Sequence, residues 1–238
     1  MSSYSVIIPA AGSGSRMGAP IPKVLLSVPN HSKKYSVVRH TVELFHSDSR
    51  CERIVVCHPA EWRGEFETQV RDMNKVELVC GGQSRQESVF KGIEVLIKAK
   101  PSSISEAVLV HDAARCCLDK DTIQSVLDGV KKYGAVTAAV PAVDSLCCVD
   151  ESECIVSYIE RSTARAIQTP QGFILRELRE AHVKALDDGY IGLDDASIMA
   201  RLREVRIVAG SKANIKVTTP EDMVALKAFF ENQEELNG

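Results

Sequence analysis

The sequence predicts an α/β fold with a mostly parallel sheet that carries helices on both faces. Short runs rich in β-branched residues alternate with segments whose apolar residues recur at helical spacing. Repeated strand-helix-strand units form parallel sheets, because each crossover helix must return the chain across one face. The sheet is therefore expected to be Rossmann-like, with ligands bound at the carboxyl ends of its strands.

The expected elements follow one another with few interruptions. Strands are expected at residues 4–9, 53–57, 76–80, 107–110, 135–140, 166–169 and 205–208. Helices are expected at residues 36–45, 61–71, 121–132, 173–186 and 221–231, with two more opening at Ser84 and Asp194. The helix after Ser84 has the clearest signal, because Ser84 and Glu87 form a capping-box pattern and Val89 and Ile93 share one helical face.

The alternation of strands and helices stops between residues 143 and 164. Residues 145–149 and 155–159 have the pattern of two short strands around an acidic turn, which is typical of a β-hairpin. An isolated hairpin is at best marginally stable in water, so this arm is expected to pack on another body, with a second subunit as the expected partner. Residues 1–238 are interpreted as one domain with a projecting arm.

The charge balance excludes a general attraction to nucleic acid or to an anionic membrane. The chain has 238 residues, with 29 Lys and Arg against 32 Asp and Glu, which gives a net charge of −3. A slightly acidic protein must meet phosphate groups with locally clustered cations. No segment approaches the roughly 18 consecutive apolar residues that a spanning helix needs.

The eight cysteines are interpreted as reduced thiols of a cytoplasmic protein. Two pairs are adjacent in the chain, there is no C-x-x-C motif, and the N-terminal sequence does not resemble a secretory leader. A zinc site is not expected, because the histidines are scattered and the spacing of metal ligands is missing.

A glycine-rich loop follows the first expected strand. Its sequence is Pro9-Ala10-Ala11-Gly12-Ser13-Gly14-Ser15-Arg16-Met17-Gly18, and Pro22-Lys23 come shortly after it. The third glycine lies one place too late for a dinucleotide fingerprint, and the P-loop pattern is absent. Small residues at a strand end let backbone N–H groups approach phosphate oxygens, and Arg16 and Lys23 add two cations. A flexible turn with solvated charges is the alternative interpretation.

Two further motifs follow later strands. The first is Gly81-Gly82-Gln83-Ser84-Arg85-Gln86-Glu87-Ser88, where a helix N-terminus favours an anion and Arg85 and Ser88 are candidates to face a ligand. Taken by itself, this motif is explained better by plain helix capping. The second is His111-Asp112-Ala113-Ala114-Arg115, which delivers a carboxylate to the edge of the sheet. Asp112 is interpreted as a ligand for a ribose, a polyol or a metal rather than as a salt-bridge partner of Arg115, and His111 as a packed residue rather than a base.

The order and spacing of these motifs carry a resemblance to one enzyme family. Three later motifs extend it, namely Thr169-Pro170-Gln171-x-Phe173, Asp194-Asp195-Ala196-Ser197 and Asn214-Ile215-Lys216-Val217-Thr218-x-Pro220-Glu221-Asp222. The combination closely resembles 2-C-methyl-D-erythritol 4-phosphate cytidylyltransferases of the non-mevalonate isoprenoid pathway, nearly from end to end.

The resemblance implies a nucleotidyltransferase-type fold and a specific reaction. CMP would pass from CTP to 2-C-methyl-D-erythritol 4-phosphate, here called methylerythritol phosphate, with release of pyrophosphate and with Mg²⁺ or another divalent cation. Arg16 and Lys23 fall on the positions that stabilise the transition state, and Arg161 and Lys216 on those that position methylerythritol phosphate. The implied substrate-binding residues are Ala10, Ala11, Gly12, Gly14, Gly82, Arg85, Ser88, Asp112, Ala113, Arg115, Ser145 and Thr169. The arm would form a homodimer and bring Arg161 into the partner's site.

Physical chemistry is consistent with this assignment. Attack of one phosphate on another brings anions together, so catalysis needs positioning and electrostatic stabilisation rather than a general base. Most of the Mg²⁺ coordination is expected to come from the triphosphate, with Asp112 as the one protein ligand considered.

The sequence departs from the family pattern in several places. Cys116 stands where Pro is frequent, Leu193 where Thr is frequent, Gln83 where an acid is frequent, and Ser145 where Thr is frequent. A cytidylyltransferase for another polyol phosphate, such as ribitol 5-phosphate, is the nearest alternative. More distant alternatives are a dinucleotide-binding oxidoreductase, which the late third glycine and a missing ribose-binding acid disfavour, and a non-catalytic nucleotide sensor.

Overall fold

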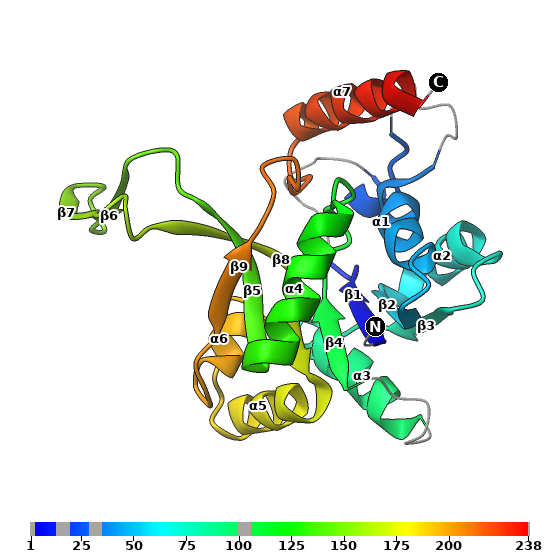
Figure 1. Ribbon diagram of the computed structural model, residues 1–238, viewed down its shortest axis with the longest axis horizontal. Helices are drawn as coiled ribbons and strands as arrows, with labels where there is room; N and C mark the ends of the chain where they lie inside the picture. The colour runs from blue at the N-terminus through cyan, green and yellow to red at the C-terminus, as the bar shows by residue number, and fades with distance from the viewer. Residues whose placement is uncertain (1–2, 13–19, 29–34, 100–105, 238) are drawn as a thin grey trace.

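Seven strands form a single mixed sheet in the computed structural model, which describes residues 3–12, 20–28, 35–99 and 106–237 (Figure 1). In spatial order they are β3 (Val76–Cys80), β2 (Cys51–His58), β1 (Tyr4–Pro9), β4 (Ala107–Val110), β8 (Arg165–Ile174), β5 (Ala135–Pro141) and β9 (Arg206–Ala209). Every neighbouring pair is parallel except the two that β8 makes, with β4 and β5. The predicted fold class, a mostly parallel sheet, is confirmed.

Helices cover both faces of the sheet, as predicted. On one face lie α1 (Val37–His46), α2 (Arg63–Val70), α4 (Lys120–Tyr133) and part of α7 (Pro220–Asn237). On the other lie α3 (Arg85–Lys98), α5 (Leu175–Asp187) and α6 (Asp195–Met199). Strand β1 separates the two cores, because Val6 and Ile8 point into the first and Ile7 into the second.

The direction of the connections changes at β1. The chain moves from β1 to β2 and β3 on one side, and then returns to place β4 on the other side of β1. Open α/β sheets bind ligands outside the carboxyl ends of the strands at such a reversal, because the two outgoing loops diverge there and leave a crevice. The topology therefore places the candidate site at the ends of β1 and β4.

The predicted start of the helix after β8 is wrong, and the last predicted helix continues beyond residue 231 to Asn237. The sequence pattern predicts a helix from residue 173, but Phe173 and Ile174 belong to β8, where they lie opposite Val108 and Ala107 of β4. The helix α5 begins only at Leu175. Tertiary pairing overrides the local signals of Pro170 and Gly172, and Gly172 is needed there because an added Cβ would lie 2.5 Å from a Val130 methyl group of α4.

The predicted hairpin is present and projects from the sheet as an arm, defined here as residues 143–164 (Figure 1). Its strands are β6 (Leu146–Val149) and β7 (Ile155–Ile159), and every residue in both is exposed. The apolar side chains of Leu146, Val149, Ile155 and Tyr158 are among those that lie open to solvent. Exposed apolar surface on this scale is typical of a surface that meets another body.

All eight cysteines lie within the described residues, and none of them forms a disulfide. Cys116 and Cys117 are buried in the core, whereas Cys147, Cys148 and Cys154 are exposed on the arm. Among the described helices, none has the length and apolar character needed to cross a lipid bilayer.

Candidate active site

Two loops pack against each other where β1 and β3 end. The first loop leaves β1, and the Ala10 N–H donates to the Cys57 carbonyl at 2.8 Å, which extends the sheet register by one residue. The second loop contains Gly81, where an added Cβ would lie 2.5 Å from the Ala11 Cβ. This close approach explains why glycine is needed at position 81, and it sets the spacing between the two backbones.

The helix α3 begins inside the second loop. Ser84 Oγ accepts a hydrogen bond from the Glu87 N–H at 3.1 Å, as the capping pattern predicts. The Glu87 carboxylate accepts from the Gln83 N–H at 2.7 Å instead of from Ser84, so the second half of the capping box is shifted by one residue. Ser88 Oγ is buried and accepts from the Gly82 N–H at 2.9 Å, which fixes the turn that faces the pocket.

Asp112 lies at the end of β4 among three cations. Its Oδ1 accepts from Arg85 Nε at 3.1 Å, and its Oδ2 lies 2.8 Å from Lys216 Nζ and 3.8 Å from Arg115 Nε. Burial alone would raise the pKa of Asp112, but the charges of Arg85 and Lys216 hold that pKa well below its usual range. Asp112 is therefore ionised at neutral pH, and the Arg115 salt bridge is only one of several that it makes.

Buried polar side chains of β8 fasten the loops that carry Asp112 and Lys216. Thr169 Oγ1 accepts from the Asp112 N–H at 3.0 Å. Asn214 Nδ2 donates to the Thr169 carbonyl at 2.7 Å, and Gln168 Nε2 donates to the Ser211 carbonyl at 2.8 Å. The motifs around Thr169 and Asn214 thus hold the end of β4 and the Lys216 loop together.

His111 is a structural residue, as expected from the sequence. It is fully buried, and its ring lies within hydrogen-bonding distance of the Arg115 carbonyl and of Thr169 Oγ1, at 2.9 and 3.1 Å. Burial lowers the pKa of His111 to about 4. The imidazole is therefore neutral at physiological pH and supports the loop beside Asp112.

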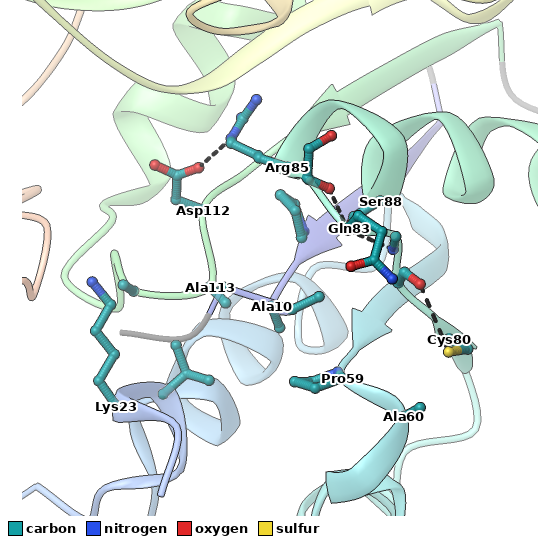
Figure 2. Close-up of a pocket in the computed structure, with 18 of the residues that line it drawn as sticks. Ala10, Lys23, Pro59, Ala60, Cys80, Gln83, Arg85, Ser88, Asp112 and Ala113 are labelled. Carbon is teal, nitrogen blue, oxygen red and sulfur yellow. Dashed lines mark hydrogen bonds and ion pairs between the residues drawn. The ribbon is translucent and has the colours of Figure 1, made fainter. Parts of the chain in front are cut away.

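A pocket of about 650 Å³ opens between these loops (Figure 2). Figure 2 shows Lys23 on one side of it, Asp112 and Arg85 on another, and the Pro59–Ala60 segment along its floor as drawn. Lys23 enters from the short helix η2 (Lys23–Leu25), and Ala60 belongs to η3 (Ala60–Trp62). The volume is within the usual range of small-molecule sites, and several backbone turns and cations face it.

The structure brings most of the predicted site residues to this pocket. The lining includes Ala10, Ala11, Gly12, Lys23, Gly82, Arg85, Ser88, Asp112, Ala113 and Lys216. Arg115 and Thr169 do not line it but contact Asp112 from behind. Gly14 and Arg16 lie outside the described residues.

Two predicted site residues are not brought to the pocket of the same chain. Ser145 and Arg161 are exposed residues of the arm, where Arg161 Nη2 donates to Ser145 Oγ at 2.8 Å. The arm points away from the body of the molecule (Figure 1).

Some residues at the site were not assigned from the sequence. Pro59, Glu61 and Cys80 line the pocket because β2 and β3 are the neighbours of β1 on that side. Their position at the end of an expected strand, or within four residues after it, was a usable signal. Asp195, which pairs with Arg85 at 2.7 Å, had no such signal, since 110 residues separate the two in the chain.

The described residues contain no group of three or more His, Cys, Asp and Glu side chains able to hold a metal ion. Within the described pocket lining, only Glu61 and Asp112 have carboxyl groups, and Asp112 is paired with cations. This donor set fits a divalent cation such as Mg²⁺, which binds through one or two carboxylates together with water molecules and the phosphate oxygens of a nucleotide.

Comparison with known proteins decides the family. The sequence profile of the family described as IspD, 2-C-methyl-D-erythritol 4-phosphate cytidylyltransferase, matches residues 4–232. The chain belongs to this family. A 2-C-methyl-D-erythritol 4-phosphate cytidylyltransferase of Bacillus cytotoxicus is 38% identical over 97% of this chain and 99% of its own length. One from Bacillus cereus is 39% identical over the same shares.

Solved structures agree with the sequence comparison. The crystal structure of the Francisella tularensis 2-C-methyl-D-erythritol 4-phosphate cytidylyltransferase is 27% identical and superposes with a TM-score of 0.81, covering 96% of this chain and 100% of that one. The Thermus thermophilus enzyme is 28% identical, with a TM-score of 0.75 and coverage of 96% and 99%.

Three departures from the cytidylyltransferase pattern have different surroundings. Cys116 is buried in the core behind the Asp112 loop, so this departure changes the packing of the core. Leu193 is 95% exposed and precedes the Asp194 cap of α6. Gln83 lines the pocket, with its backbone N–H bonded to Glu87.

Proposed function

We propose that CMP is transferred from CTP to methylerythritol phosphate in the pocket at the ends of β1 and β4. The activity follows from membership of the cytidylyltransferase family. The location is supported by one observation: Lys23, Arg85 and Lys216 line a single pocket at the point where the strand order reverses. In a chain with a net charge of −3, this local cluster supplies the positive charge that two phosphate substrates require.

The reaction in this proposal is a direct displacement at the α-phosphorus of CTP. A phosphate oxygen of methylerythritol phosphate forms the new P–O bond, and the bond between the α-phosphorus and the bridging oxygen of pyrophosphate breaks. The leaving pyrophosphate keeps the bonding electron pair. Because the attacking phosphate is already ionised at neutral pH, no general base is needed, and the neutral His111 is not used.

The cations have separate roles in the proposal. Lys23 and Arg16 stabilise the charge that develops on the transferred and leaving phosphates. Lys216, anchored beside Asp112, holds the phosphate of methylerythritol phosphate together with Arg161 of the partner subunit. The small residues Ala10 to Gly12, together with Gly14, present the first-loop backbone to the nucleotide, and Gly82 and Ser88 present the second.

A divalent cation, Mg²⁺ in this proposal, would neutralise phosphate charge when bound with CTP. Asp112 is the carboxylate best placed to approach it, at the end of β4 and within the pocket lining. The cations around Asp112 keep it ionised, which a ligand for a hard cation requires.

A homodimer formed through the arm completes the site. Its exposed apolar residues, which include Val149, Ile155 and Tyr158, have the character of an interface. Arg161 and Ser145 are hydrogen-bonded to each other on the arm and do not line the pocket of their own chain. In the dimer they would line the pocket of the second subunit.

Pyrophosphate release tests the function and the acceptor. Purified protein is incubated with CTP and Mg²⁺ and with methylerythritol phosphate, ribitol 5-phosphate or no acceptor. We expect release with methylerythritol phosphate only. Release with ribitol 5-phosphate but not with methylerythritol phosphate would contradict the acceptor, and release without any acceptor would indicate hydrolysis of CTP rather than transfer.

A further inference from the structure

A chain of four side chains runs from the interior of the molecule to the pocket. His182 Nε2 donates to Asp195 Oδ1 at 3.0 Å, and Asp195 Oδ2 accepts from Arg85 Nη1 at 2.7 Å. Arg85 Nε then donates to Asp112 Oδ1 at 3.1 Å, and this last bond is drawn in Figure 2. Asp195 of α6 thus links His182 of α5 to Arg85 of α3.

The inner half of this chain is fully enclosed. The side chains of Asp195 and His182 are 0% and 1% exposed, and the His182 ring stacks on Phe90 with an interplanar angle of 10°. A buried carboxylate is tolerated only when it is paired and hydrogen-bonded. Burial would raise the pKa of Asp195, but Arg85 and His182 keep that pKa below its usual value, so the group is charged.

The backbone around Asp195 is also fixed. Asp194 and Ser197 form a complete capping box at the start of α6. The Ala196 N–H donates to Gln171 Oε1 at 2.9 Å, and Gln171 is a buried residue of β8. Asp195 therefore has a defined position from which to hold Arg85.

The two carboxylates divide the donors of Arg85 between them. Nη1 is taken by Asp195, while Nε reaches Asp112. Without the charge of Asp195, the guanidinium would be free to turn and bind both oxygens of Asp112 in a bidentate pair, the preferred geometry of Arg and carboxylate. That rearrangement would compete with Lys216 for Asp112 Oδ2.

We propose that Asp195, held by His182, is a positioning residue that sets the direction of Arg85 and through it the geometry of Asp112 and Lys216. This role rests on the proposed function, in which Lys216 binds the phosphate of methylerythritol phosphate. Asp195 itself does not line the pocket, so it acts only through Arg85.

Steady-state kinetics of Asp195→Asn tests this role. The substitution keeps the shape and removes the charge. We expect kcat/KM for methylerythritol phosphate to fall at least about tenfold, with KM for CTP changed less than about threefold. Asp188→Asn is the control for loss of a carboxylate charge with two cationic partners, because Asp188 pairs with Arg201 and Lys184 at the surface outside the pocket lining, and wild-type kinetics are expected.

A double-mutant cycle separates positioning from a general loss of structure. If Asp195 acts through Arg85, then adding Asp195→Asn to Arg85→Gln should change kcat/KM by less than about twofold. Additive losses in the double variant would overturn the proposal. His182→Phe, which keeps the stacking on Phe90 but lacks the donor, should show a weaker form of the Asp195→Asn defect, and His182→Gln should restore part of it.

A spectroscopic readout makes the inference independent of the acceptor. The Nη–H signals of Arg85 in ¹⁵N NMR, assigned by their loss in Arg85→Lys, include the Nη1 protons that Asp195 holds, and these should exchange with water at least about tenfold faster in Asp195→Asn than in wild type or Asp188→Asn. Unchanged exchange would contradict the role of Asp195. Failure of the proposed function would instead appear as absent pyrophosphate release in the wild type, with this NMR difference preserved.

Discussion

Replacing Lys23 by alanine is expected to lower the turnover number at least about tenfold while CTP still binds. Lys23 lines the pocket from η2, below Asp112 in the view of Figure 2, where it can meet charge that grows on the phosphates during transfer. A group that acts mainly in the transition state affects kcat more than ground-state binding. Arg16→Ala is expected to behave in the same way.

The measurement is kcat from pyrophosphate release, together with CTP binding by calorimetry. Lys184→Ala is the matched control, since Lys184 is an exposed lysine of α5 that pairs with Asp188 away from the pocket. It should keep wild-type turnover. A Lys23→Ala protein with unchanged turnover would remove Lys23 from the transition-state role.

Mixed dimers should recover activity from two inactive subunits. Lys23→Ala and Arg161→Ala proteins are each expected to be nearly inactive. In a mixed dimer, one site combines an intact Lys23 with an intact Arg161 from the other subunit, because the two residues come from different chains. Random mixing should therefore restore about a quarter of wild-type activity, since half of the dimers are mixed and each has one intact site.

The dimers must be verified, for example by differently tagged subunits purified in sequence. Mixing either variant with itself is the negative control. If verified mixed dimers show no recovery, Arg161 does not act across the interface. If Arg161→Ala alone keeps full activity, then Arg161 is not part of the site.

The fold class was predictable because local patterns and topology agree. The apolar runs around Val6, Val55 and Leu109 are strands buried on both faces, and their alternation with helical periods permits few arrangements other than a parallel sheet. The capping residues Ser84 and Asp194 also marked the starts of α3 and α6 correctly.

The end of β8 was not predictable from local sequence. Pro170 and Gly172 normally weaken a strand, yet β8 continues through both to Ile174 because it pairs with β4 and β5 on its two sides. Pairing between segments far apart in the chain decides this boundary, and no local window contains that information.

The candidate site also has a part that the sequence predicts and a part that it does not. Backbone loops at strand ends, such as Ala10 to Gly12 and Gly82, could be found because their position follows from topology. The arrangement of charges could not. Arg85 was expected to face a ligand, but its donors are shared between Asp112 and Asp195, and that pairing depends on how α3, α6 and β4 pack.

A direct displacement between two phosphates, organised by cations and without an enzyme nucleophile, is the core of the proposed chemistry. It is tested by the configuration at phosphorus, using CTP with sulfur in place of one α-phosphate oxygen and methylerythritol phosphate as acceptor. One in-line displacement inverts that configuration, whereas two successive displacements through an enzyme-bound CMP retain it. The cationic site described here predicts inversion, and retention of configuration in the product would contradict it.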